Sequence, residues 1–95
     1  MPTFEEVWAR IVSNAGANNQ PIISTKGLPA TYEMNGPTTV CVIRNGTEWK
    51  IPKGHFLQAY NLGLPLENTV PLQHLMGPSW IWAIFNDDRI NQGEW

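Results

Sequence analysis

Residues 51–55, Ile-Pro-Lys-Gly-His, bring together groups that can bind an anion. They lead into a helical pattern but supply no Ser, Thr, Asp or Asn cap and no acid in the first turn of that helix. Lys53 and His55 instead lie beside the positive end of the helix dipole, which disfavours cations. An anion held by the free N–H groups, with these two side chains beside it, would remove the conflict.

The same pattern has a simpler explanation, in which Gly54 is an adequate cap and water satisfies the free N–H groups. Lys53 then points away from the start of the helix and binds nothing. The substitution Gly54→Asp separates the two explanations, because higher stability with unchanged ligand binding would support the simpler one.

Charge is spread unevenly along this chain of 95 residues, whose formal net charge is -2. Residues 26–60 hold four basic residues against two glutamates, whereas residues 61–95 hold one arginine against four acids. This basic excess is far below what binding to duplex nucleic acid requires, but it allows a small anionic ligand. The acidic last third favours, as the alternative, contact with a basic protein partner.

The basic residues do not meet at one point of the expected sheet. Lys26 and Arg44 fall at one end of the strands, and Lys53 and His55 fall at the opposite end. Strands of this length separate the two groups by roughly 16 Å, at ~3.3 Å per residue. One copy of the chain therefore makes only a shallow site, and we expect a homo-oligomer that completes the pocket across an interface.

Five tryptophans are a high number for this length. Trp8 and Trp49 are core residues by helical periodicity and by strand pairing. Trp80 and Trp82 share a short apolar run, and either both rings are buried or one lines a pocket or an interface, where tryptophan is enriched. The predicted ligand-binding residues are Lys50, Lys53, Gly54, His55, Arg44, Trp80 and Trp82.

Patterns for acid, base or nucleophilic catalysis are missing from the sequence. Cys41 lies in an apolar strand pattern, with no neighbour that would activate it as a thiolate. The adjacent acids Glu5-Glu6 and Asp87-Asp88 fit a helix start and a solvated end, and neighbours in sequence point apart. No Gly-x-Ser-x-Gly turn occurs. We therefore predict that the protein is not an enzyme.

Metal and cofactor motifs are missing as well. His55 and His74 are the two histidines, and neither has a cysteine or carboxylate at ligand spacing. The glycine-rich phosphate motifs of nucleotide-binding folds do not occur. The sequence predicts no metal and no cofactor.

The clearest predicted element is a helix over residues 3–15. Thr3 and Glu6 have the spacing of a capping box, and Gly16 provides the left-handed stop. Apolar residues recur between them at helical spacing and form one stripe, which consists of Phe4, Val7, Trp8, Ile11, Val12 and Ala15.

Two Asn-Gly pairs predict two hairpins after a short strand at 22–24. A two-residue loop at Asn45-Gly46 pairs Val42 with Trp49 and Val40 with Ile51 on the apolar face, and Cys41 with Lys50 on the other face. At Asn35-Gly36 a two-residue loop would require Pro37 to donate a hydrogen bond, which it cannot do. We therefore predict a three-residue loop over 35–37, which pairs Met34 with Thr38 and Tyr32 with Val40.

Short helices are expected at 55–62 and 69–76, separated by Leu64-Pro65-Leu66. The apolar run 80–85 fits a helix or a buried strand, and Pro78-Ser79 favour the helix. Asp87 and Asp88 oppose it, because acids are unfavourable at the carboxyl end of a helix.

These elements predict an α+β fold with an N-terminal helix, a three- or four-stranded antiparallel meander and two or three short C-terminal helices. Residues 1–95 form a single domain, and residues 86–95 form a flexible or partner-docking tail. No apolar run is long enough to cross a membrane and the N-terminus is acidic, so we expect a cytoplasmic protein.

The function expected from these residues is non-catalytic binding of a small phosphate-bearing, nucleotide-like ligand. A nucleotide-sequestering accessory or anti-defence protein of a phage or mobile element would fit this description. The alternative is a protein-binding inhibitor or adaptor that uses a Trp-rich apolar patch at Trp80–Phe85 and the acidic C-terminal region.

Overall fold

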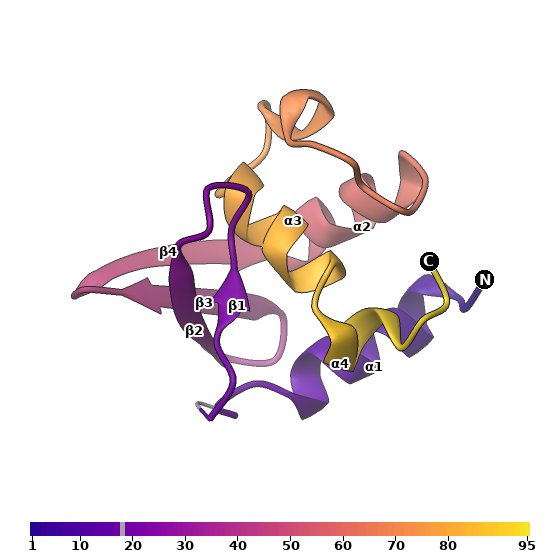
Figure 1. Ribbon diagram of the computed structural model, residues 1–95. Coiled ribbons are helices and arrows are strands. Elements are labelled where there is room, and N and C mark those ends of the chain that lie inside the picture. Colours follow the sequence, from indigo (N-terminus) through magenta and orange to yellow (C-terminus); the bar gives the residue numbers. More distant parts are fainter. Residues whose placement is uncertain (18) are drawn as a thin grey trace.

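The computed structural model describes residues 1–17 and 19–95, which form one antiparallel sheet with helices packed on one face (Figure 1). The sheet has the strand order β1-β2-β3-β4, and α3 lies between it and α2 (Figure 1). The elements are α1 (Phe4–Ser13), β1 (Ile22–Ile23), β2 (Pro29–Met34), β3 (Thr39–Arg44), β4 (Thr47–Pro52), α2 (Lys53–Asn61), the 3-10 helix η1 (Val70–Leu72), α3 (Pro78–Phe85) and α4 (Asp88–Asn91). The predicted α+β class and order of elements are confirmed.

Helix α1 forms as its sequence predicts. The amide of Glu6 donates to Thr3 Oγ1 at 3.2 Å, and Gly16 ends the helical segment with a φ of 81°. The apolar stripe of α1 is buried against the core, through Phe4, Val7, Trp8 and Ile11.

The β3–β4 hairpin has the predicted register. Asn45 and Gly46 form its two-residue loop, both with positive φ, as a type I′ turn requires. Val42 pairs with Trp49 and Cys41 pairs with Lys50.

The predicted register of β2 with β3 is wrong by two residues. Met34 pairs with Val40 instead of Thr38, and Tyr32 pairs with Val42. The amide of Asn35 donates to Thr39 O at 2.8 Å, which extends the ladder and leaves residues 36–38 as the loop. Pro37 lies inside that loop, where it needs no donor. Because the shift is an even number of residues, the same side chains still face the core.

The helices after the sheet differ in extent from the prediction. Helix α2 starts at Lys53, two residues before the predicted start, whereas only one 3-10 turn forms within 69–76. The amide of Met76 donates to His55 Nδ1 at 3.0 Å, so the segment is held against α2 and does not continue its own helical ladder.

Residues 78–85 are a helix, as the Pro78-Ser79 pattern favoured. Asp87 does not prevent this helix, because its side chain caps the start of the next one, α4. That side chain accepts from the amide of Arg89 at 2.9 Å.

The C-terminal residues lie against α1 rather than apart from the domain. Arg10 Nη1 donates to Ile90 O at 2.9 Å, and its Nη2 is paired with the Glu94 carboxylate. The indole N–H of Trp95 donates to Phe85 O at 2.8 Å. Docking of a partner on residues 86–95 stays a prediction.

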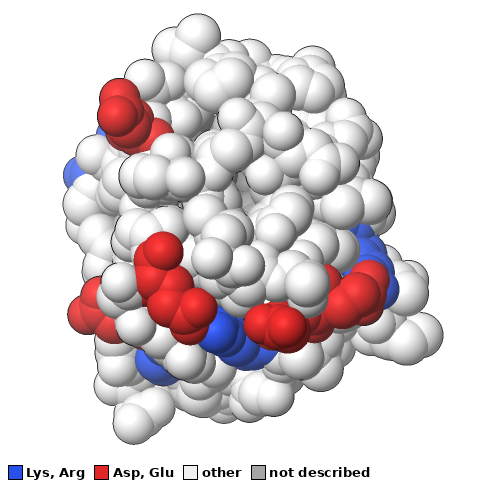
Figure 2. Space-filling view, turned by 90° about the vertical axis from the view of Figure 1, so that its right-hand side faces the viewer, with Lys and Arg blue, Asp and Glu red and all other residues white. Residues whose placement is uncertain are grey.

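One side of the molecule carries a large uncharged area. Figure 2 shows most charged side chains of this side in a band across its lower half. Residues 54–86 contain a single charged side chain, Glu67, if histidine is left aside. Four exposed apolar side chains belong to the same stretch, namely Leu57, Leu62, Val70 and Met76. In the part of the chain that the structure describes, no helix has the length and apolar composition to cross a bilayer.

Candidate functional site

A cavity of about 240 Å³ lies where three segments meet. The β1–β2 turn, strand β4 and the start of α3 each form one wall. The residues that line it are Ser24, Lys26, Leu28, Trp49, Gly77, Pro78, Ser79 and Trp80. This cavity is the candidate ligand site, and we call it the Trp49–Trp80 cavity.

Two indole rings, together with Leu28 and Pro78, form the apolar part of the cavity. The ring centroids of Trp49 and Trp80 are 5.4 Å apart and the planes are tilted by 56°. Trp80 is 5 % exposed and belongs to the core cluster, whereas Trp49 is half-buried. The half-buried Trp49 ring therefore offers an aromatic face on which a planar ring can stack, and the buried Trp80 ring packs against it.

The β1–β2 turn carries the only cation that lines the cavity in the described residues, Lys26. Ser24 fixes the shape of this turn, because its buried Oγ accepts from the amides of Lys26 at 3.3 Å and Leu28 at 3.2 Å. The backbone of Lys26 is therefore held in place, while its side chain is exposed and free to meet an anionic group.

The start of α3 forms the remaining wall through Gly77, which packs directly against the sheet. A Cβ at this position would lie 3.0 Å from Ile51 Cδ1, and the residue has a φ of 57°, which favours glycine. The amides of Trp80 and Ile81 already donate to Gly77 O, so Gly77 begins the helix without a side-chain cap.

The two side chains expected to hold an anion at the start of α2 make contacts within the protein. Lys53 Nζ lies 3.3 Å from Glu5 Oε2 and 5.5 Å from the centroid of the Trp8 ring. His55 Nδ1 accepts from the Met76 amide. Pro52 makes no side-chain cap and Gly54 is exposed, as the sequence suggests, but the Lys53 amide donates to Thr38 O at 2.8 Å.

The other predicted ligand-binding residues lie apart from one another. Arg44 donates to Pro29 O at 2.8 Å, and Lys50 projects from the sheet face away from the core. Trp82 is half-buried on α3, and its Nε1 has no hydrogen-bond partner among the described residues. Of the seven predicted residues, Trp80 alone lines the Trp49–Trp80 cavity.

Sequence reasoning missed the polar lining of this cavity. Lys26 was assigned to the correct end of the sheet but was left out of the site, and Ser24 and Ser79 were not considered. The predicted Asn45-Gly46 turn lies at this same end of the sheet, but nothing in the sequence connects it with α3.

Cys41 is a structural residue. Burial, followed by the nearby carboxylate of Glu48, raises the pKa of its thiol above the ordinary value. Its Sγ lies 3.6 Å from Glu48 Oε1. A thiol that resists ionisation is a poor nucleophile and a poor metal ligand.

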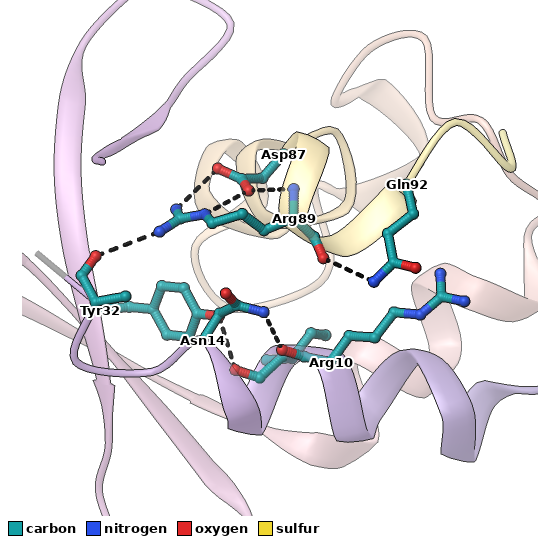
Figure 3. Close-up of polar contacts among 8 residues, drawn as sticks. Arg10, Asn14, Tyr32, Asp87, Arg89 and Gln92 are labelled. Atoms are coloured by element: carbon teal, nitrogen blue, oxygen red, sulfur yellow. Dashed lines mark hydrogen bonds and ion pairs between the residues drawn. The ribbon is translucent and has the colours of Figure 1, made fainter. Parts of the chain in front are cut away.

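A buried polar cluster joins α1, β2 and α4 (Figure 3). Arg89 donates to both carboxylate oxygens of Asp87, at 2.8 and 2.9 Å, and to Ala17 O at 3.3 Å. The hydroxyl of Tyr32 donates to Ile11 O at 2.7 Å. The hydrogen bonds that Arg89 donates to Asp87 raise the pKa of Arg89, so its positive charge is fixed. Each of these polar groups has a hydrogen-bond partner within the protein, which is the pattern of a structural network rather than of a reacting site.

This cluster leads to a prediction for alkaline pH. Burial raises the pKa of Tyr32 above its ordinary value, so above about pH 10 the unfolded chain loses this proton first and stability falls as pH rises. Tyr32→Phe should lower the free energy of unfolding by about 1 kcal/mol at neutral pH. Above pH 10 the variant should lose less stability with rising pH than the wild type, by up to about 1.4 kcal/mol per pH unit. Urea unfolding from pH 8 to 11 measures both. Because lysines titrate equally in both proteins, parallel pH profiles would contradict the prediction.

The described residues contain no group of three or more His, Cys, Asp or Glu side chains that could hold a metal ion. Comparison of the chain with models of protein families, with curated proteins and with solved structures finds no match. The functional conclusion therefore depends on the geometry of the site alone.

Proposed function

We propose that this protein binds, without catalysis, a small nucleotide-like ligand in the Trp49–Trp80 cavity. One observation carries the proposal: a lysine and two tryptophan rings line the same cavity. A base stacked on the Trp49 ring would present the phosphate of the ligand to the Lys26 ammonium. The expected function is therefore kept, while the site moves from the start of α2 to the start of α3.

The size of the cavity limits what one copy can hold. Its volume of about 240 Å³ lies below the ~300 Å³ at which most pockets for drug-sized ligands begin. A base fits, whereas the sugar and phosphate extend toward the surface. A homo-oligomer that deepens the site across an interface is part of the proposal. We place the protein in the cytoplasm, where a free thiol such as Cys41 stays reduced.

Ligand binding is tested by calorimetric titration with nucleoside mono-, di- and triphosphates. Lys26→Ala should weaken binding about tenfold, the effect expected for loss of one charged hydrogen bond to phosphate. Lys53→Ala is the matched control, since it removes the same side chain from the start of α2, and it should leave affinity unchanged. Bound ligand should also raise the melting temperature, by an amount that grows with the logarithm of the ligand concentration above the dissociation constant.

The two variants distinguish the two sites. If Lys53→Ala weakens binding and Lys26→Ala does not, the ligand binds at the start of α2 and the Trp49–Trp80 cavity is not the site. If no nucleotide binds the wild-type protein, the proposed function is wrong.

Protein binding is the second candidate function, and the uncharged area favours it. The Trp80–Phe85 run does not supply the exposed patch, because it lies in α3 and most of its side chains are buried in the core. Val70 and Met76 instead expose 74 % and 49 % of their surfaces, in a stretch with one charge. Exposed apolar surface of this kind is typical of contact with another protein.

A further inference from the structure

Strand β4 forms one edge of the sheet and presents unpaired backbone groups. Arg44 and Thr47 flank the two-residue turn and exchange hydrogen bonds. Because hydrogen-bonded pairs alternate along an antiparallel ladder, Trp49 and Ile51 also direct their N–H and C=O groups toward β3. The Lys53 amide, which donates to Thr38 O, continues this alternation. The N–H and C=O groups of Glu48 and Lys50 therefore point outward from the sheet.

Nothing in the described residues covers this edge. Glu48 and Lys50 are exposed, and no hydrogen bond from a turn, loop or side chain of residues 1–17 and 19–95 reaches their backbone groups. Figure 1 shows the β3–β4 hairpin extending away from the helices. An open edge of this kind pairs readily with another strand unless its side chains prevent it.

We propose that two copies of this chain pair through antiparallel β4 strands, with the twofold axis at Trp49. Glu48 then faces the partner's Lys50, and Lys50 faces the partner's Glu48. Both residues point their backbone groups outward, so each of these two pairs exchanges two hydrogen bonds. The side chains form two cross-strand ion pairs on the sheet face away from the core.

The charges select this register over its neighbours. An axis at Glu48 would place two glutamates opposite each other, and an axis at Lys50 would oppose two lysines. The second of these would also set Glu48 against Pro52, which has no N–H to donate. Only the axis at Trp49 pairs opposite charges and uses all the outward N–H groups of Glu48 and Lys50.

This pairing also changes the Trp49–Trp80 cavity. At the axis Trp49 lies opposite the partner's Trp49, on the face of the sheet that carries the cavity. Each copy then adds a ring beside the other's site. The strand pairing itself does not depend on a ligand, so it is tested on the ligand-free protein.

The test is a reciprocal charge exchange, measured by sedimentation equilibrium of the full chain. Glu48→Lys opposes two lysines at each pair and Lys50→Glu opposes two glutamates, so each should weaken dimerisation about tenfold or more. The double exchange restores opposite charges and should return the dissociation constant to near the wild-type value. Glu33→Lys is the matched control: it reverses a charge on the same sheet face, on β2, which β3 separates from β4, and it should leave the dissociation constant unchanged.

A wild-type protein that remains monomeric at the highest soluble concentration would overturn the proposal. So would a dimer that both single variants leave intact, or one that the double exchange fails to restore. If the wild-type protein dimerises but binds no nucleotide, the proposed function is wrong and the strand pairing is not affected.

Discussion

Replacing Phe56 with alanine is expected to lower the free energy of unfolding by about 3–5 kcal/mol. Phe56 is fully buried, and its ring centroid lies 5.8 Å from that of Trp8 and 5.9 Å from that of Phe85. One ring thus connects α2 to α1 and α3, and its removal leaves a cavity at the point where three helices meet. Urea unfolding followed by circular dichroism measures the loss.

Leu57→Ala is the control for this prediction. Leu57 is the next residue of α2 and is 40 % exposed, so its truncation should cost less than about 1 kcal/mol. A domain of this size has a total stability of about 5–14 kcal/mol, so Phe56→Ala removes at least about a fifth of it. Equal losses for the two variants would show that Phe56 does not hold the helices together.

Asp87→Ala is expected to lower the free energy of unfolding by about 2–4 kcal/mol, because it removes the cap of α4 and leaves the half-buried Arg89 guanidinium without its carboxylate partner. Asp87 is 8 % exposed, and its carboxylate takes two hydrogen bonds from the Arg89 side chain as well as the amide that starts α4. Alanine retains none of these contacts. The same denaturation experiment at neutral pH measures the loss.

Two further variants separate the effect of the unpaired guanidinium from loss of the cap. Asp88→Ala removes an exposed acid from the same turn and should cost little. The double variant Asp87→Ala/Arg89→Met should be more stable than Asp87→Ala alone, since it removes the unpaired guanidinium. If the double variant is the less stable of the two, the cost does not come from a stranded charge.

Local sequence patterns determined the elements in which neighbouring residues make the contacts. The Thr3 cap and the Asn45-Gly46 turn involve residues within a few positions of each other, and both are confirmed. The loop over 36–38 was missed because its register depends on one extra backbone pair, between Asn35 and Thr39.

The candidate site was harder to predict because its residues come from distant segments. Lys26, Trp49 and Ser79 lie on three elements, and no periodicity connects them. The same limit applies to the start of α2, where Lys53 meets Glu5 from the opposite part of the chain. A residue pattern shows that Lys53 and His55 lack local partners, but it cannot show partners that folding brings from elsewhere.

The even shift between the expected and observed registers of β2 on β3 has a consequence for folding. Both alignments turn the same side chains inward, including Tyr32 and Val42. The choice of which apolar side chains are buried therefore does not distinguish the two alignments. The native alignment is preferred through a few main-chain bonds near the loop and through the fit of individual side chains. The alternating pattern of β2 and β3 thus allows both alignments, and the hydrogen bond from Asn35 to Thr39, together with side-chain packing, selects the native one.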